Sequence, residues 1–194
     1  MPDESLQILL VYGSVRRERV GIRLAHHLAR AVEARGHRAS LADPLEIDLP
    51  LLDRMFKEYA PGTAPEPMAR MAGLIAAADA VVVISGEYNH GIPPALKNLL
   101  DHFLEEWFGR PAGIATYSPG RFGGVRAAMQ LRMTLAELGM PTMPTLLPVP
   151  GIAQVLDEAG RSEAQWLTDQ TGRFLDELTW WARAAKAERG REGA

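Results

Sequence analysis

The sequence predicts an α/β fold in which helices cover both faces of a parallel sheet. Two observations carry this prediction. Short apolar runs alternate with segments whose apolar residues recur about every 3.6 positions, the pattern of strands alternating with amphipathic helices. The run AVVVIS at residues 80–85 is continuously apolar and mostly β-branched, as expected for a strand buried on both faces. Strands alternating with helices are joined by right-handed crossovers and therefore run parallel.

Five strands and five helices are expected, in alternation. The strands are expected at residues 6–12, 38–42, 80–85, 111–117 and 141–147. The helices are expected from residue 21 to about 35, at 67–77, from 93 onward, at 125–138 and at 161–186. Residues 43–65 are rich in proline and poor in periodicity, so we expect a loop there with one helical turn near 51–59. Prolines in the last strand favour an edge position.

Length and composition limit the class of protein. The 194 residues are 47% hydrophobic, which is enough for one core, so we expect a single domain over residues 1–194 with a frayed polar tail at 187–194. The net charge of −3 shows no basic excess of the kind that binds nucleic acid. The absence of cysteine excludes disulfides and thiolate nucleophiles.

Targeting and metal signals are also missing from the sequence. No apolar run approaches the ~20 residues of a membrane span. The acidic N-terminal residues lack the pattern of a secretory signal, so we expect a cytoplasmic protein without a membrane partner. The five histidines do not have the spacing of metal ligands, and no metal site is expected.

The loop after the first strand is the most informative segment. Gly13 and Ser14 end an apolar run, Arg16 follows, and a helical pattern begins after Gly21. A hydroxyl, a guanidinium and the N-terminus of a helix are the donors that bind a phosphate. Neither a Walker loop nor a dinucleotide fingerprint is present, which favours a mononucleotide. The alternative is an ordinary turn with solvated arginines.

Two further loops follow strands and are rich in glycine and polar residues. They span residues 86–91 and 118–124. In an open parallel sheet, ligands bind beyond the carboxyl ends of the strands, so we expect these loops and the first one to meet in one crevice. The alternatives are a polar turn before a helix for the first of them and a flexible glycine-rich loop for the second.

Together, the segments GSVRRERVG (13–21), GEYNHGIPPALKNLLD (86–101) and YSPGRFGG (117–124) resemble the NAD(P)H-dependent FMN reductase family. The resemblance covers roughly residues 6–150. It implies a flavodoxin-like three-layer α/β/α sandwich with strand order 2-1-3-4-5. It also implies bound FMN, NADPH or NADH as co-substrate, and a homodimer or homotetramer.

The resemblance assigns site residues by position. The FMN phosphate would be held by Ser14, Arg16 and Val20. The isoalloxazine ring would be lined by Glu87, Tyr88, Asn89 and Gly91, and approached from its other side by Ser118, Gly120 and Gly124. Two positions depart from the family pattern: Gly86 stands where proline is common, and Val20 lies near the place of a second serine.

The resulting hypothesis is an FMN-dependent oxidoreductase with ping-pong kinetics. Hydride would pass from NAD(P)H to FMN and then to a small-molecule acceptor such as a quinone, a flavin, an azo dye or chromate. No side chain is expected to act as a catalytic acid or base. One alternative is a flavodoxin-type electron carrier, although such carriers are usually strongly acidic. The other is a non-enzymatic interaction module that uses Phe103, Trp107 and Phe108; in the enzyme we expect this segment at a homodimer contact.

Overall fold

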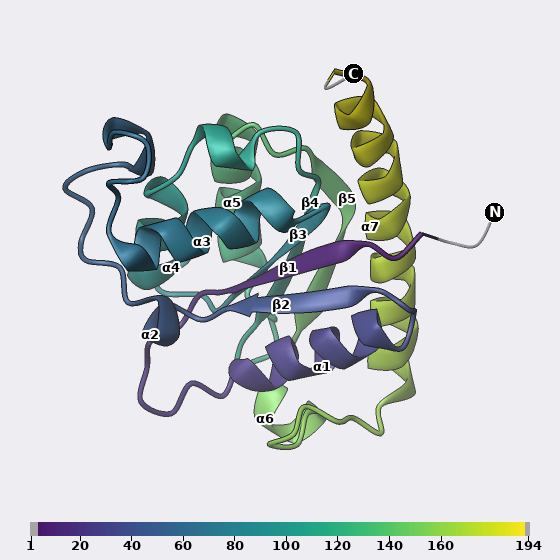
Figure 1. The fold of residues 1–194 in the computed structure, drawn as a ribbon. Helices are drawn as coiled ribbons and strands as arrows, with labels where there is room; N and C mark the ends of the chain where they lie inside the picture. The colour runs from purple at the N-terminus through teal and green to yellow at the C-terminus, as the bar shows by residue number, and fades with distance from the viewer. Residues whose placement is uncertain (1–3, 193–194) are drawn as a thin grey trace.

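The computed structural model describes residues 4–192 and contains a five-stranded parallel sheet (Figure 1). The strand order is β2-β1-β3-β4-β5, as the resemblance implies. The strands are β1 (Gln7–Tyr12), β2 (Arg38–Ala42), β3 (Ala80–Ser85), β4 (Ala112–Tyr117) and β5 (Thr142–Val149). The helices are α1 (Ile22–Glu33), α2 (Pro44–Ile47), α3 (Glu66–Ala77), α4 (Pro94–Asp101), α5 (Val125–Glu137), α6 (Ile152–Val155) and α7 (Gln165–Glu192).

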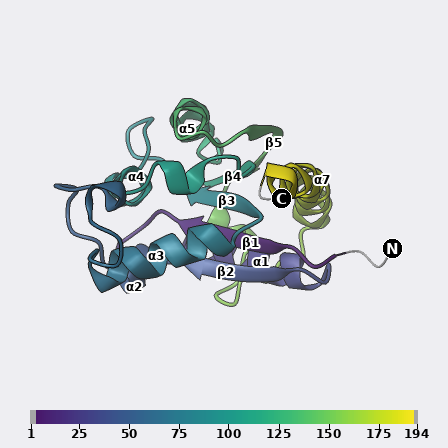
Figure 2. The same ribbon diagram turned by 45° about the horizontal axis from the view of Figure 1, so that its top comes forward.

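The helices form two layers, one on each face of the sheet. Alternate residues of β1 divide between two cores: Ile8 and Leu10 pack with α1 and α7, whereas Leu9 and Val11 pack with α3, α4 and α5. The layers explain why α3 and α7 are well separated in both views of the molecule (Figures 1 and 2). The predicted α/β class, with helices on both faces of a parallel sheet, is therefore confirmed.

The proline-rich stretch 43–65 is more structured than expected. A 3-10 turn at Phe56–Glu58 confirms the helical turn expected near 51–59. The short helix α2 is an addition, and its start has a clear local cause. The Asp43 side chain accepts a hydrogen bond from Leu45 N at 3.0 Å, and Pro44 occupies the first turn, where its missing N–H costs nothing.

A frayed tail was expected at residues 187–194, but α7 continues through residue 192. Residues 193–194 lie outside the described residues. Lys186 Nζ lies 3.1 Å from Asp79 Oδ2 and 2.9 Å from Glu4 Oε1. Arg189 donates a hydrogen bond to Gly109 O at 2.7 Å. These contacts attach the last turns of α7 to the amino-terminal edge of the sheet. Within residues 4–192, no helix is long and apolar enough to cross a membrane.

Two of the three aromatic residues after α4 lie in the core, contrary to the homodimer contact expected for this segment. Phe103 and Trp107 are fully buried, and their rings meet edge to face with centroids 6.2 Å apart. Trp107 Nε1 donates a hydrogen bond to Leu100 O at 3.1 Å. Phe108 is the member of the three that remains exposed. The apolar spacing of this segment is compatible with either a core or an interface, and Phe103 and Trp107 lie in the core.

His27 joins α1 to α7 and is expected to make stability depend on pH. Nε2 lies 3.1 Å from Thr171 Oγ1 and Nδ1 lies 3.3 Å from Gly160 O. Burial lowers the pKa of His27 below its ordinary value of 6.5, so the unfolded chain binds a proton more readily than the folded one. Stability is therefore lost as pH falls below about 6.5.

Urea unfolding of wild type and His27→Gln at several pH values tests this expectation. The variant should show a weaker loss of unfolding free energy below pH 6.5, because its side chain does not titrate. His26→Gln is the matched control, since His26 is the exposed neighbour on the same helix. Equal pH dependence in wild type and His27→Gln would contradict the assignment.

Candidate functional site

A cleft of about 290 Å³ lies at the carboxyl ends of β1, β3 and β4. It is lined by all three loops that the sequence singled out. Six of the expected residues line it: Ser14, Arg16, Val20, Glu87, Tyr88 and Ser118. Four expected residues do not: Asn89, Gly91, Gly120 and Gly124. The cleft also includes Gly21, Gly86, Tyr117 and Ile152, to which the sequence analysis gave no role as ligand contacts.

The loop after β1 carries donors suited to a phosphate. Ser14 is buried, and its hydroxyl accepts a hydrogen bond from Arg16 N at 3.3 Å. The Arg16 side chain is exposed at the cleft. Within residues 4–192, the N–H groups of Arg17 and Gly21 have no protein acceptor. Val20 contributes less than expected, because its N–H donates to Glu18 O at 2.6 Å within the loop.

Arg19 has a structural partner that the sequence analysis missed. Its Nη1 lies 2.5 Å from the carboxylate of Asp43, which is 2% exposed. Its guanidinium also stands 5.8 Å from the ring centroid of Tyr12. Because Asp43 also caps α2, this ion pair joins the first loop to the carboxyl end of β2. Arg16 is therefore the more available arginine for a ligand.

Tyr117 forms the inner wall of the cleft, and its role was also missed. A Cβ at Gly21 would overlap the Tyr117 ring, so the glycine lets the ring pack against the start of α1. The Tyr117 hydroxyl lies close to those of Tyr12 and Ser14. Burial raises the pKa of Tyr117 far above its ordinary value, so the phenol stays protonated. The sequence signal was present, because Tyr117 opens the motif YSPGRFGG.

The loop after β3 is a tight turn with an aromatic at its base. Tyr88 N donates to Gly91 O at 3.0 Å, and Gly91 N donates to Tyr88 O at 2.8 Å. Between them, Asn89 and His90 have positive φ values of 48° and 67°, which is the geometry of a type I′ turn. The turn carries Asn89 and Gly91 away from the cleft and leaves the Tyr88 side chain at its rim, 36% exposed.

The loop after β4 uses its polar and glycine residues to hold its own shape. Ser118 Oγ donates to Gly120 O at 2.8 Å and accepts from Gly123 N at 3.0 Å. Gly124 has a φ of 78°, and a Cβ there would lie 2.9 Å from Tyr117 O. These residues therefore shape the loop that lines the cleft. Gly120 is exposed, with open space where a Cβ would stand.

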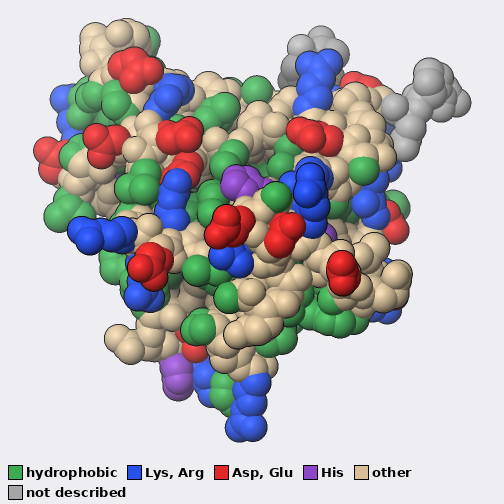
Figure 3. Space-filling model, turned by 90° about the horizontal axis from the view of Figure 1, so that it is seen from below, with side chains coloured by type: hydrophobic (Ala, Val, Ile, Leu, Met, Phe, Trp, Pro, Cys, Tyr) green, Lys and Arg blue, Asp and Glu red, His purple; other side chains and the backbone are tan. Residues whose placement is uncertain are grey.

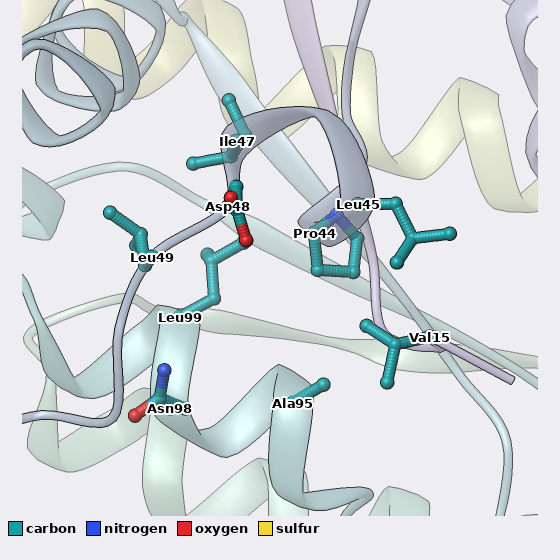
Figure 4. Close-up of a pocket in the computed structure, with 9 residues that line it drawn as sticks. All are labelled: Val15, Pro44, Leu45, Ile47, Asp48, Leu49, Ala95, Asn98 and Leu99. Atoms are coloured by element: carbon teal, nitrogen blue, oxygen red, sulfur yellow. The ribbon is translucent and has the colours of Figure 1, made fainter.

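A second hollow of about 140 Å³ lies beside the first loop (Figure 4). Val15 contributes to it, although the neighbouring Ser14 and Arg16 line the cleft. The other lining residues come from α2, the segment after it and α4, and they are mostly aliphatic. This hollow includes none of the expected site residues. In the part of the chain that the structure describes, no three metal-ligating side chains gather at a site.

Charge is evenly distributed on the visible surface. In the view from below, acidic and basic side chains are interspersed (Figure 3). Charges of both signs also line the cleft, where Arg16 and Arg19 are accompanied by Glu18 and Glu87. A strongly acidic docking face, the usual device of a small electron carrier, is not seen in this view.

Comparison with known proteins gives a consistent family. The model of the NADPH-dependent FMN reductase family matches residues 6–154. A quinone reductase of Pseudomonas putida is 31% identical over 194 residues, covering 93% of this chain and 96% of the relative. An NAD(P)H-dependent FMN reductase of Schizosaccharomyces pombe is 34% identical over 182 residues, covering 82% and 84%.

Solved structures share the fold. The flavoenzyme NAD(P)H:(acceptor) oxidoreductase FerB of Paracoccus denitrificans superimposes with a TM-score of 0.75 at 24% identity, covering 93% of this chain and 98% of that one. A flavodoxin of Pseudomonas aeruginosa superimposes with a TM-score of 0.54 at 18% identity, covering 94% and 98%. The expected flavodoxin-like sandwich is therefore confirmed.

Proposed function

The chain belongs to the NADPH-dependent FMN reductase family, and from that premise we propose ping-pong transfer of hydride from NAD(P)H, through FMN, to a small-molecule acceptor. The chain is an oxidoreductase, with FMN as cofactor and NAD(P)H as co-substrate. We propose a quinone as the acceptor, because quinone reductases are among its relatives. Free flavins and azo compounds are the acceptors to compare with it.

The meeting of three loops in one cleft carries the proposed FMN site. Ser14, Arg16 and the backbone N–H groups of Arg17 and Gly21, which have no acceptor among the described residues, are donors of the kind that bind a phosphate dianion. Tyr88 offers an aromatic surface at the rim for a flat ring system. Tyr117 keeps its phenolic proton and can donate a hydrogen bond inside the cleft. The residues present therefore fit a flavin mononucleotide.

The protein's part in the reaction is binding and orientation. Bound FMN supplies the hydride chemistry. The buried Ser14 and the half-buried Tyr117 fix the inner end of the cleft, while Tyr88 and the 118–124 loop limit how a second ring can approach. Both substrates would use the same open face in turn, which is the physical basis of a ping-pong sequence.

A visible spectrum tests the cofactor and the reaction. Purified protein, incubated with FMN and then desalted, should absorb near ~450 nm with about one flavin per chain. Under anaerobic conditions, NADPH or NADH should bleach this band, and a quinone should restore it. Initial rates at several quinone concentrations should give parallel double-reciprocal lines. Bound flavin that neither nucleotide reduces would favour the electron carrier, and a colourless protein would contradict the FMN site.

We also propose that the chain forms a homodimer or homotetramer. Val15 and Leu45 are exposed apolar residues that line the second hollow, and they support a contact surface there. Leu51 and Leu52, which follow its lining residue Leu49 in the chain, are exposed as well. We propose this surface as the dimer contact in place of Phe103 and Trp107, because those two residues are buried. A sedimentation mass of one 21.2 kDa chain at micromolar concentration would contradict this proposal.

A further inference from the structure

We propose that Glu87 is a positioning residue that couples two of the cofactor loops, rather than a residue that contacts the flavin ring. The inference rests on the proposed FMN site. Glu87 Oε2 accepts hydrogen bonds from Arg126 N at 3.0 Å and Ala127 N at 3.3 Å. Its Oε1 lies 3.5 Å from Arg126 Nη1. The carboxylate of the loop after β3 therefore caps α5, the helix that follows the next loop.

The sequence of α5 explains why the cap must come from elsewhere. The first N–H groups of a helix need acceptors and carry partial positive charge, which a carboxylate satisfies best. The residue at the cap position is Gly124, which has no side chain to serve as acceptor. Its φ of 78° and the nearby Tyr117 O exclude serine or aspartate there without strain. Glu87 supplies the missing acceptor from 39 residues earlier in the chain.

The coupling extends from the cap to the tip of the third loop. Arg126, which Glu87 contacts, also stands 4.6 Å from the ring centroid of Phe122. Arg121 stands 4.9 Å from the same centroid. A chain of contacts thus joins Glu87 to the 118–124 loop at both its tip and its end. Because Tyr88 and Ser118 line the cleft, the two loops would move together and keep the width of the cleft fixed.

Two variants separate positioning from direct contact with the flavin. Glu87→Gln keeps a carbonyl oxygen that can accept from the α5 N–H groups, and loses only the negative charge. Glu87→Ala removes the acceptor. We expect Glu87→Ala to raise the dissociation constant for FMN about tenfold, and Glu87→Gln to raise it less than about threefold. Fluorescence titration of FMN measures both values, and Glu137→Ala at the exposed far end of α5 is the control.

The midpoint potential of the bound flavin provides the decisive readout. A carboxylate in contact with the ring would shift the potential when its charge is lost, so Glu87→Gln and Glu87→Ala would then change it equally. In the positioning role, Glu87→Gln keeps the wild-type potential. Equal shifts in both variants, or wild-type FMN affinity in Glu87→Ala, would overturn the inference.

A measurement on the flavin-free protein distinguishes failure of this inference from failure of the proposed function. The cap exists without FMN, so the urea midpoint of unfolding should fall for Glu87→Ala and recover most of its value in Glu87→Gln. A protein that shows this pattern but binds no flavin would refute the FMN site and retain the cap. A protein that binds flavin without this pattern would refute the cap alone.

Discussion

Gly21→Ala is expected to weaken FMN binding by roughly 30-fold while the fold survives. The backbone at Gly21 is in the ordinary right-handed region, with a φ of −61°, so the added methyl group causes no backbone strain. It would instead overlap the Tyr117 ring. The ring must then move away from the hydroxyls of Tyr12 and Ser14, and the space open to it is the cleft. Overpacking of this kind costs about 2 kcal/mol, which corresponds to the expected loss of affinity.

Fluorescence titration of FMN, together with urea unfolding, measures this effect. Gly73→Ala is the control, since Gly73 lies within α3 with open space around it, and alanine there should stabilise the chain slightly. Adding Tyr117→Ala to Gly21→Ala should recover unfolding free energy, because the overlap disappears. Unchanged FMN affinity in Gly21→Ala would show that Tyr117 does not border the cofactor.

Asp43→Ala is expected to lower the free energy of unfolding by about 3 kcal/mol. Asp43 is buried and holds two partners: Arg19 as an ion pair at 2.5 Å and the N–H of Leu45 at the start of α2. Breaking a buried pair by removing one partner costs about 3–5 kcal/mol. The 25% exposure of the Arg19 side chain reduces that cost, because water can solvate the freed guanidinium, and loss of the helix cap adds about 1 kcal/mol.

Asp43→Asn separates the two contributions. Its amide oxygen can still cap α2, so this variant should lose less than Asp43→Ala. Urea unfolding of the FMN-free protein measures all three chains. A loss below about 1 kcal/mol for Asp43→Ala would contradict the structural role of the pair, since that is the value of an exposed contact.

The strands were predictable because their signals are local. The run at residues 80–85 is apolar at every position, and β3 occupies those residues. The short helix α2 was not predicted, because its four residues show no period and only the Asp43–Pro44 pair marks its start. The end of α7 was missed for the opposite reason. Its sequence is polar, and it is held by Asp79, a residue more than a hundred positions away.

The site was predictable at the level of loops rather than contacts. Strand–loop–helix order placed Ser14, Tyr88 and Ser118 around one cleft. Sequence alone does not indicate that Glu87 turns toward α5 or that Arg19 is occupied by Asp43, because both depend on distances between separate loops. Tyr117 was overlooked because a tyrosine at the end of a strand also fits ordinary packing.

Strand β5 limits the ways in which two copies of this chain can associate. Val149 O accepts a hydrogen bond from Ser118 N, and the backbone groups of Val149 therefore face β4. Backbone groups of successive strand residues alternate in direction, and Pro148 therefore faces the open edge without an N–H to offer. This edge is a poor template for a strand from a second copy. Any assembly across it would need side chains rather than a continuous intermolecular sheet.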